Sequence, residues 1–374
     1  MRILSVFGTR PEAIKMAPVI LKLQHTSGIT SQVCVTGQHR EMLDQALDLF
    51  QITPEFDLRI MRSGQTLSSI TSEILLKIND IFEKFKPDIV LVHGDTTTAY
   101  ATALAAFYKK IPIGHIEAGL RTGDINHPWP EEMNRRTIDM LSSILFAPTL
   151  SAKECLLAEG YPDESIFVTG NTVIDSLKII YNRIKNDLCL QKKIDEQLNL
   201  PQNKKIILVT GHRRENFGHS LENICDALLK ISQRNDVAIF YPVHMNPNVY
   251  NVVFERLSQR KNIYLIKPLD YISFIYLMSR SYLILTDSGG IQEEAPSLGK
   301  PVLVMRNKTE RPEGVQIGTV KLVGTETKNI VTECNSLLDD TVLYNRIQNT
   351  KNPYGDGLAS ERIISAIKNL STKI

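Results

Sequence analysis

Two carboxylates lie where the chain leaves apolar segments that are typical of buried parallel strands. Asp95 closes the segment IVLVHGD, and Glu117 follows an apolar run in HIEAGLRTG. A carboxylate at such a position is costly unless it is paired or solvated in a cleft. We therefore interpret both as candidate site residues. The structural alternatives are a helix N-cap at Asp95 and an ion pair between Glu117 and Arg121.

A third carboxylate begins a helix in the segment NHPWPEEMNRR. Glu131, near the N-terminus of this helix, would complement the helix dipole. Glu131 and Arg135 are four residues apart, the spacing of an ordinary ion pair on one helix face. The loop before them holds a His, two prolines and the only Trp of the chain, which suits the wall of a binding cleft.

A glycine turn with two cations follows the first apolar segment. In GTRPEAIKMAPV, Gly8 permits a tight turn, and Pro11 suits the first turn of a helix. Arg10 and Lys15 add positive charge to that helix. A strand, a glycine turn and a positively charged helix N-terminus form a site for a phosphate or diphosphate. An ordinary turn with two solvated cations is the alternative.

A second glycine turn lies in TDSGGIQEEAPSLGKPVL, at the end of another apolar segment. The backbone N–H groups of residues 288–290 can surround a phosphate. A carboxylate a turn further on, at Glu293 or Glu294, can accept hydrogen bonds from both hydroxyls of a ribose. With Arg311 further along the chain, the pattern is more specific than a glycine pair before a helix.

Two histidines occupy corresponding places in successive strand-to-helix turns. In VTGHRRENFG, His212, Arg213 and Arg214 come directly off a strand, and in YPVHMNPNV, His244 lies at the end of the next strand. Cations and a titrating imidazole at strand ends suit a diphosphate ligand and proton transfer. A surface cluster without a ligand is the alternative.

All of these groups fall at the ends of apolar segments that alternate with helical patterns. The expected strands are residues 2–9, 32–37, 88–94, 112–117, 144–148 and 166–170, then 205–211, 237–243, 263–268, 283–287 and 301–305. Such a series indicates parallel α/β sheets covered on both faces, here two doubly wound Rossmann-like domains in tandem. Ligands of these folds bind at the carboxyl ends of the strands, which two such domains would place across one central cleft.

A polar segment, residues 181–205, separates the two series of strands. We place the hinge near residues 170–175, which predicts an N-terminal domain over residues 1–170 and a C-terminal domain over residues 171–357.

Composition narrows the class of protein. A hydrophobic fraction of 43% and a charged fraction of 22% describe a folded globular chain, and a net charge of +2 argues against a dedicated nucleic-acid binder. No apolar run approaches membrane-spanning length, so we expect a cytoplasmic protein. Five widely spaced cysteines fit reduced core thiols. The chain has no G-x-G-x-x-G and no clustered metal ligands, so we expect neither a nicotinamide nor a metal.

In their order and spacing, GTRPEAIKMAPV, GDTTT, HIEAGLRTG, PEEMNRR, GHRRENFG and TDSGGIQEEAPSLGKPVL resemble the non-hydrolysing UDP-N-acetylglucosamine 2-epimerases. The resemblance implies the glycosyltransferase-B architecture, with a C-terminal helix (residues 358–374) that packs back on the first domain, and a homodimer. It implies reversible conversion of UDP-N-acetylglucosamine to UDP-N-acetylmannosamine for surface polysaccharides, by elimination and re-addition of UDP through 2-acetamidoglucal.

Three alternatives stay open. They are a hydrolysing 2-epimerase that releases N-acetylmannosamine and UDP, a relative acting on a diacetamido-uronic sugar nucleotide, and a glycosyltransferase of the same architecture.

The resemblance also assigns residues by position. The acid/base set is Asp95, Glu117, Glu131 and His212. The substrate-binding set is Arg10, Lys15, Arg135, Phe274, Ser288, Gly289, Gly290, Glu294 and Arg311. A second UDP-N-acetylglucosamine, acting as an activator, would bind Gln38, His39, Gln65, Arg213 and His244. No cofactor, nucleic acid or membrane is implied.

Overall fold

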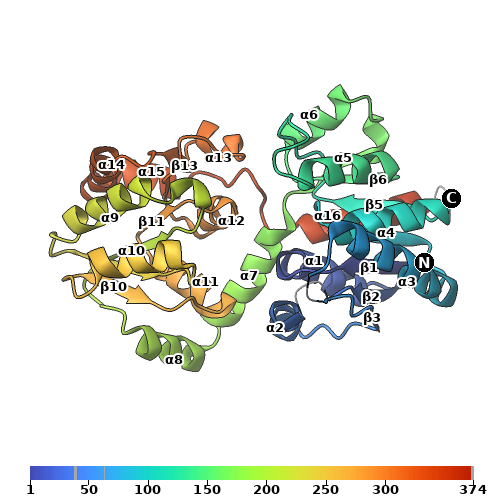
Figure 1. Cartoon of the computed structure of the whole chain (residues 1–374), viewed down its shortest axis with the longest axis horizontal. Helices are drawn as coiled ribbons and strands as arrows, with labels where there is room; N and C mark the ends of the chain where they lie inside the picture. Colours follow the sequence, from blue (N-terminus) through green and yellow to red (C-terminus); the bar gives the residue numbers. More distant parts are fainter. Residues whose placement is uncertain (38–39, 63, 372–374) are drawn as a thin grey trace. The chain divides into compact units, whose positions relative to one another are not determined.

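The chain forms two compact units, each built around its own parallel sheet (Figure 1). The structure is a computed structural model that describes residues 1–37, 40–62 and 64–371. Unit 1 comprises Met1–Ser176 and Tyr354–Ile374, and unit 2 comprises Leu177–Pro353. Helix α7 (Thr172–Lys185) contains the point at which the chain passes from unit 1 to unit 2. The predicted α/β class with two parallel sheets is confirmed.

The sheet of unit 1 has seven parallel strands in the order β3-β2-β1-β4-β5-β6-β7. Their bounds are β1 Arg2–Phe7, β2 Thr30–Val35, β3 Phe56–Asp57, β4 Ile89–His93, β5 Ile113–Ile116, β6 Ile144–Ala147 and β7 Ile166–Val168. The strand order reverses between β1 and β4, and the loops that follow these two strands are where doubly wound sheets bind ligands. These loops begin at Gly8 and Gly94.

Helices cover both faces of this sheet (Figure 1). They are α1 Arg10–Gln24, α2 Arg40–Phe50, α3 Leu67–Phe85, α4 Thr97–Tyr108, α5 Glu131–Leu141, α6 Leu150–Ala158, the start of α7, and α16 Ala359–Ser371. In α3 the buried residues Ile70, Ile74, Ile78 and Ile81 recur at helical spacing and belong to one core cluster with residues of α4, β1 and β4. Strand β4 is buried along its whole length, as a central parallel strand must be.

Helix α16 joins unit 1 through contacts with α1 and α7. The Asp175 carboxylate accepts hydrogen bonds from the N–H groups of Ala359 and Ser360, 3.1 and 2.8 Å long, and from the Ser360 hydroxyl, 2.7 Å long. Lys22 and Glu361 form an ion pair of 2.8 Å between α1 and α16. The last helix therefore completes the unit in which the chain begins.

The sheet of unit 2 has six parallel strands in the order β10-β9-β8-β11-β12-β13. Their bounds are β8 Lys205–Thr210, β9 Val237–Pro242, β10 Ile263–Ile266, β11 Leu283–Thr286, β12 Val302–Val304 and β13 Val320–Leu322. The helices are α8 Leu188–Leu198, α9 His219–Ile231, α10 Pro247–Leu257, α11 Tyr271–Arg280, α12 Gly289–Glu294, α13 Pro312–Gln316, α14 Thr327–Asp339 and α15 Thr341–Gln348. The order again reverses beside the first strand, between β8 and β11.

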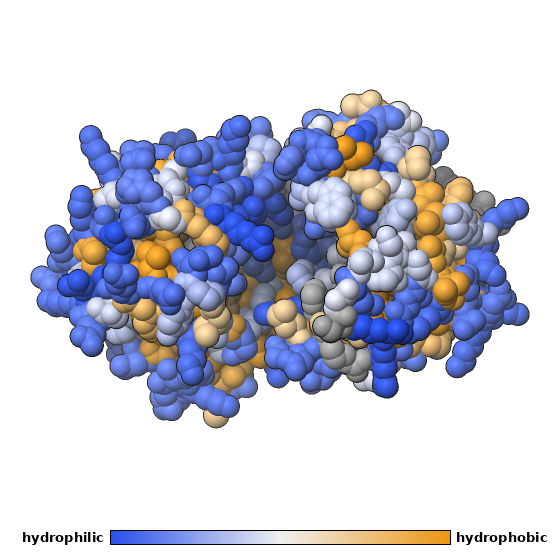
Figure 2. Space-filling model, in the orientation of Figure 1, coloured by the Kyte–Doolittle hydropathy of each residue, from blue (hydrophilic) through white to orange (hydrophobic). Residues whose placement is uncertain are grey.

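All eleven strands expected from the sequence are present, with ends that differ by a few residues. Two strands were missed, β3 and β13, which are two and three residues long and lie at sheet edges. None of the described helices combines the length and apolar composition that crossing a membrane requires. On the face shown in Figure 2, hydrophilic residues dominate the surface of each unit and apolar residues are scattered between them.

Candidate active site

In unit 1, Glu117 directly follows β5 and has a left-handed backbone conformation, with φ of +73°. Such a value is strained for a residue with a side chain and is often found at functional sites. The carboxylate is 10% exposed and forms an ion pair with Lys15 of α1. It also accepts a hydrogen bond of 3.0 Å from the Asn171 side-chain amide. Glu117 is thus held by groups from two other segments of the chain, α1 and the residues just before α7.

A buried histidine of β4 lies beside the same carboxylate. His93 Nε2 is 3.9 Å from Glu117 Oε2 and has no hydrogen-bond partner among the described residues. Burial lowers the pKa of His93 to about 3, so this imidazole is neutral near pH 7. A neutral ring whose unsatisfied nitrogen faces Glu117 can hydrogen-bond to the carboxylate after a small shift.

Asp95 follows β4 and Gly94, and its carboxylate pairs with a different cation, Arg135. Arg135 of α5 contacts Asp95 Oδ2 through Nη2 and through Nε, the latter at 3.1 Å, and contacts Glu132 at 3.1 Å. Asn134 donates a hydrogen bond of 2.8 Å to the Asp95 carbonyl. Asp95 is therefore fixed by two neighbouring residues of α5.

Both local ion pairs considered from the sequence give way to other pairings. Arg135 pairs with Asp95 and Glu132, whereas Glu131 is a half-buried residue at the start of α5. Arg121 pairs with Asp139 and Glu159, at 2.8 and 2.7 Å. The fold brings Asp95 to Arg135, and Asp139 and Glu159 to Arg121, whereas the Glu132–Arg135 pair lies within α5.

The first glycine turn packs tightly against the residue after β2 and against helix α4. A Cβ at Gly8 would overlap the hydroxyls of Thr36 and Thr98, so only glycine fits there. Arg10 and Lys15 follow on α1, and both side chains are partly exposed. Glu12 links this turn to the loop that carries Asp95, because it binds Gly8 and Thr9 as well as Thr96.

Glu12 is a buried carboxylate that sequence reasoning missed. It accepts hydrogen bonds from the N–H groups of Gly8 and Thr9, at 3.1 and 2.9 Å, and from the Thr9 hydroxyl at 2.8 Å. Its other oxygen accepts a hydrogen bond of 2.7 Å from Thr96, which also caps α4. Burial raises the pKa of Glu12 to about 7, although these hydrogen bonds act in the opposite direction.

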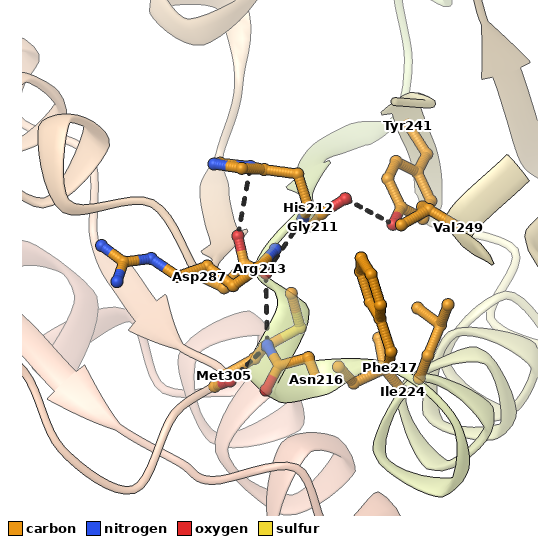
Figure 3. Close-up of a pocket in the computed structure, with 11 residues that line it drawn as sticks. Gly211, His212, Arg213, Asn216, Phe217, Ile224, Tyr241, Val249, Asp287 and Met305 are labelled. Atoms are coloured by element: carbon orange, nitrogen blue, oxygen red, sulfur yellow. Dashed lines mark hydrogen bonds and ion pairs between the residues drawn. The ribbon is translucent and has the colours of Figure 1, made fainter. Parts of the chain in front are cut away.

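In unit 2, His212 follows β8 and lies over a small cavity lined mainly by apolar side chains (Figure 3). The ring is 44% exposed and stacks on His244, with centroids 5.8 Å apart. Burial lowers the pKa of His212, the Asp287 charge raises it, and His244 and Arg213 lower it further. The imidazole is therefore available as a proton acceptor near neutral pH.

The second glycine turn starts at Ser288, the N-cap residue of α12. A Cβ at Gly289 would lie 3.0 Å from the Arg311 guanidinium, whereas the space beside Gly290 is open. Arg311 donates a hydrogen bond of 2.8 Å to Glu293. Gly290 is exposed, Ser288 is half-buried and Gly289 is buried, and the guanidinium beside this turn is a group that suits an anion.

The residues expected around the nucleoside also lie in unit 2. Glu294 is buried and accepts a hydrogen bond of 2.8 Å from the Tyr271 hydroxyl. Phe274, one turn along α11 from Tyr271, is half-buried. Phe274, which the resemblance assigns to the uracil, therefore lies on α11, and Glu294, which it assigns to the ribose, contacts the same helix through Tyr271.

The five activator-binding residues are only partly described. Arg213 and His244 adjoin His212. Gln65 lies in unit 1, where its side-chain oxygen accepts a hydrogen bond of 2.8 Å from the Arg62 N–H group. Gln38 and His39 lie outside the described residues.

The described residues contain no cluster of three or more His, Cys, Asp or Glu side chains arranged to hold a metal.

Comparison with known proteins gives the family. A profile described as UDP-N-acetylglucosamine 2-epimerase matches residues 21–368. The chain is 56% identical over 370 residues to UDP-N-acetylglucosamine 2-epimerase of Salmonella typhimurium, covering 98% of each chain. The relative from Campylobacter jejuni is 56% identical over 371 residues, covering 98% of this chain and 97% of the relative.

Solved structures agree. The crystal structure of UDP-GlcNAc 2-epimerase from Neisseria meningitidis bound to UDP-GlcNAc has a TM-score of 0.90 at 52% identity, covering 99% of this chain and 100% of the other. A glycosyltransferase from Rickettsia africae shares only the fold, with a TM-score of 0.62 at 19% identity and coverage of 99% and 97%. The resemblance inferred from the sequence is therefore confirmed, and the chain belongs to the UDP-N-acetylglucosamine 2-epimerase family.

Proposed function

We propose that this isomerase interconverts UDP-N-acetylglucosamine and UDP-N-acetylmannosamine without net hydrolysis, by eliminating UDP and adding it back. The hydrogen at C2 of the sugar is not next to a carbonyl, so its direct removal would leave an unstabilised carbanion. Loss of the C2 proton together with cleavage of the bond from C1 to the UDP oxygen gives 2-acetamidoglucal, and UDP takes the electron pair. Attack of UDP on C1, with a proton delivered to the opposite face of C2, gives the epimer.

The observation that carries this proposal is the setting of Glu117. A carboxylate that is nearly buried, strained in its backbone, held by Lys15 and Asn171 and adjacent to a neutral His93 is positioned for proton transfer. We assign Asp95, Glu131 and His212 to the same acid/base set. Variants of these four residues would show which of them transfers a proton on each face of C2.

We assign the binding of UDP to the two glycine turns and their cations. Backbone N–H groups and guanidinium or ammonium groups are what a diphosphate requires. The proposed diphosphate ligands are Arg10, Lys15, Ser288, Gly289 and Gly290, with Arg135 and Arg311 as further polar groups. Glu294 would bind the ribose, and Phe274 would border the uracil.

Glu117→Gln tests the chemistry. The variant keeps the shape of the side chain and removes the base, so turnover should fall by two or more orders of magnitude, about 100-fold at least. UDP binding, measured by calorimetry, should survive. Glu83→Gln removes an exposed carboxylate on α3 that pairs with Lys109, and it should leave turnover unchanged. Near-normal activity of Glu117→Gln would remove Glu117 from the acid/base set.

Product analysis tests the reaction itself. Incubation with UDP-N-acetylglucosamine alone in deuterium oxide should give UDP-N-acetylmannosamine carrying deuterium at C2. Accumulation of N-acetylmannosamine and UDP would identify a hydrolysing enzyme instead. An unlabelled epimer would indicate oxidation and internal hydride return.

A further inference from the structure

One buried carboxylate joins the two functional loops of unit 2. Asp287 directly follows β11, is fully buried, and immediately precedes the glycine turn at Ser288. Its Oδ2 accepts hydrogen bonds from the backbone N–H groups of His212 and Arg213, both 2.9 Å long, and from the Asn216 amide, 3.2 Å long (Figure 3). A single oxygen thus fixes the backbone of the histidine loop.

The second oxygen of the same carboxylate faces the histidine ring. Asp287 Oδ1 is 3.4 Å from His212 Nδ1 and has no hydrogen-bond partner among the described residues. A buried carboxylate oxygen without a donor is costly. A proton on Nδ1 of His212 is the donor that satisfies it.

The proton on one ring nitrogen decides what the other can do. A neutral imidazole carries one N–H and one lone pair, so a proton on Nδ1 leaves Nε2 as the acceptor. In Figure 3 the second ring nitrogen points away from Asp287. The cavity beneath the ring holds about 10 Å³, which is room for about one water at most.

We propose that Asp287 is a positioning residue that sets the tautomer of His212, so that Nε2 faces the substrate as a proton acceptor. The inference rests on the acid/base role proposed for His212. When Nε2 takes a proton, the negative charge of Asp287 stabilises the resulting imidazolium, whereas Arg213 and His244 disfavour it. The charged and titratable groups around the ring are Asp287, Arg213 and His244.

The alternative is that Asp287 only anchors the loop. Asp287→Asn separates the two roles, because the amide oxygen can still accept the backbone N–H groups. The side-chain NH₂ then faces His212 Nδ1 and donates to it, which moves the ring proton to Nε2 and removes the acceptor. The variant therefore keeps the hydrogen bonds to the backbone N–H groups of His212 and Arg213 and reverses the tautomer of the ring.

Asp287→Asn should lower kcat by about 100-fold or more and change KM for UDP-N-acetylglucosamine by less than about 3-fold. Asp340→Asn is the matched control, since Asp340 is an exposed N-cap residue of α15, and it should leave both constants unchanged. A variant that keeps wild-type kcat would overturn the proposal.

Nitrogen-15 NMR of the imidazoles reads the tautomer without relying on activity. The His212 resonances are assigned by their loss in His212→Gln, and the wild type should show the proton on Nδ1. A wild-type ring protonated on Nε2 would overturn the proposal, even if Asp287→Asn does not fold. If Asp287→Asn lowers kcat while the His212 proton stays on Nδ1, the proposal is also overturned, because Asp287 then only holds the backbone of the loop. If the wild type proves inactive as an epimerase, the proposed function fails while the tautomer is still measured.

Discussion

Each unit contains a histidine whose Nδ1 faces an aspartate, and the two pairs differ in what the other ring nitrogen contacts. In unit 1, His115 is fully buried, with Nδ1 at 2.6 Å from Asp139 and Nε2 at 2.7 Å from the Gly94 carbonyl oxygen. In unit 2, His212 lies 3.4 Å from Asp287 and is 44% exposed. The same two residue types therefore form a closed pair in one unit and an open pair in the other.

The difference shows how one pair of side chains serves two purposes. Both nitrogens of His115 are occupied, so the ring links β5, α5 and the Gly94 turn before Asp95, and it supports the site without offering a group to a ligand. Arg121 also pairs with Asp139, and although burial raises the pKa of Asp139, its two partners His115 and Arg121 lower it overall. The open pair keeps one nitrogen for chemistry.

His212→Gln should have the largest effect on this comparison. Turnover should fall by about 100- to 10,000-fold, because glutamine cannot exchange a proton near neutral pH. The melting temperature should stay within about 2 °C of the wild type, since the ring is exposed on one side. Steady-state kinetics and calorimetry measure both. A large loss of stability would mean that the open pair is structural as well.

Asp139→Asn should destabilise the closed pair. Removal of the charge leaves His115 and Arg121 facing a neutral group in a buried site, which costs about 3–5 kcal/mol of the free energy of unfolding. Denaturant unfolding measures it. Asp236→Asn, which breaks a surface pair with Arg234, should cost less than about 1 kcal/mol. Equal effects of the two variants would show that burial of the closed pair is unimportant.

Glu12→Gln should change how the free energy of unfolding depends on pH. The hydrogen bonds of the Glu12 carboxylate come from Gly8, Thr9 and Thr96, none of which is a cation. Burial raises the pKa of Glu12 from 4.5 to about 7. The folded state therefore binds more protons than the unfolded state, and the stabilisation present below pH 4.5 is lost as the pH rises through 7.

The glutamine variant has no such loss. Relative to the wild type it should gain up to about 3 kcal/mol in the free energy of unfolding between pH 5 and pH 8. Urea titrations at both pH values test this. A constant difference between the two proteins would contradict a raised pKa for Glu12.

His244→Gln should have the smallest effect. The electrostatic effect of His244 lowers the pKa of His212, so replacing His244 should raise that pKa. The acid limb of the pH dependence of kcat/KM should move upward by less than about 1 pH unit. Movement toward lower pH would mean that stacking on His244 assists protonation of His212.

The sequence predicts most of the fold, because fully buried strands such as β4 are continuous apolar runs. The edge strands β3 and β13 were missed, since they have only two and three residues and are not buried along their length, so they give no such run. Asp95 and Glu117 stand out as candidates in the sequence because a carboxylate after a buried strand is unusual.

Their partners could not be found, because strand order and not sequence distance brings Lys15 to Glu117. The contacts of Asp287 could not be predicted either, since nothing in the local sequence shows that it faces the loop after β8. Local spacing suggested Glu131 as the partner of Arg135, and the tertiary structure supplies Asp95.

The return of α16 to the first unit has a consequence for the order of folding. All residues of unit 2 lie in one continuous stretch, whereas unit 1 needs contacts between Asp175 and residues 359–360, across the whole intervening unit. Closing so long a loop is entropically costly and slow compared with forming contacts between near neighbours. Unit 2 should therefore reach its native contacts before unit 1 is complete, and α16 should be the last helix to dock.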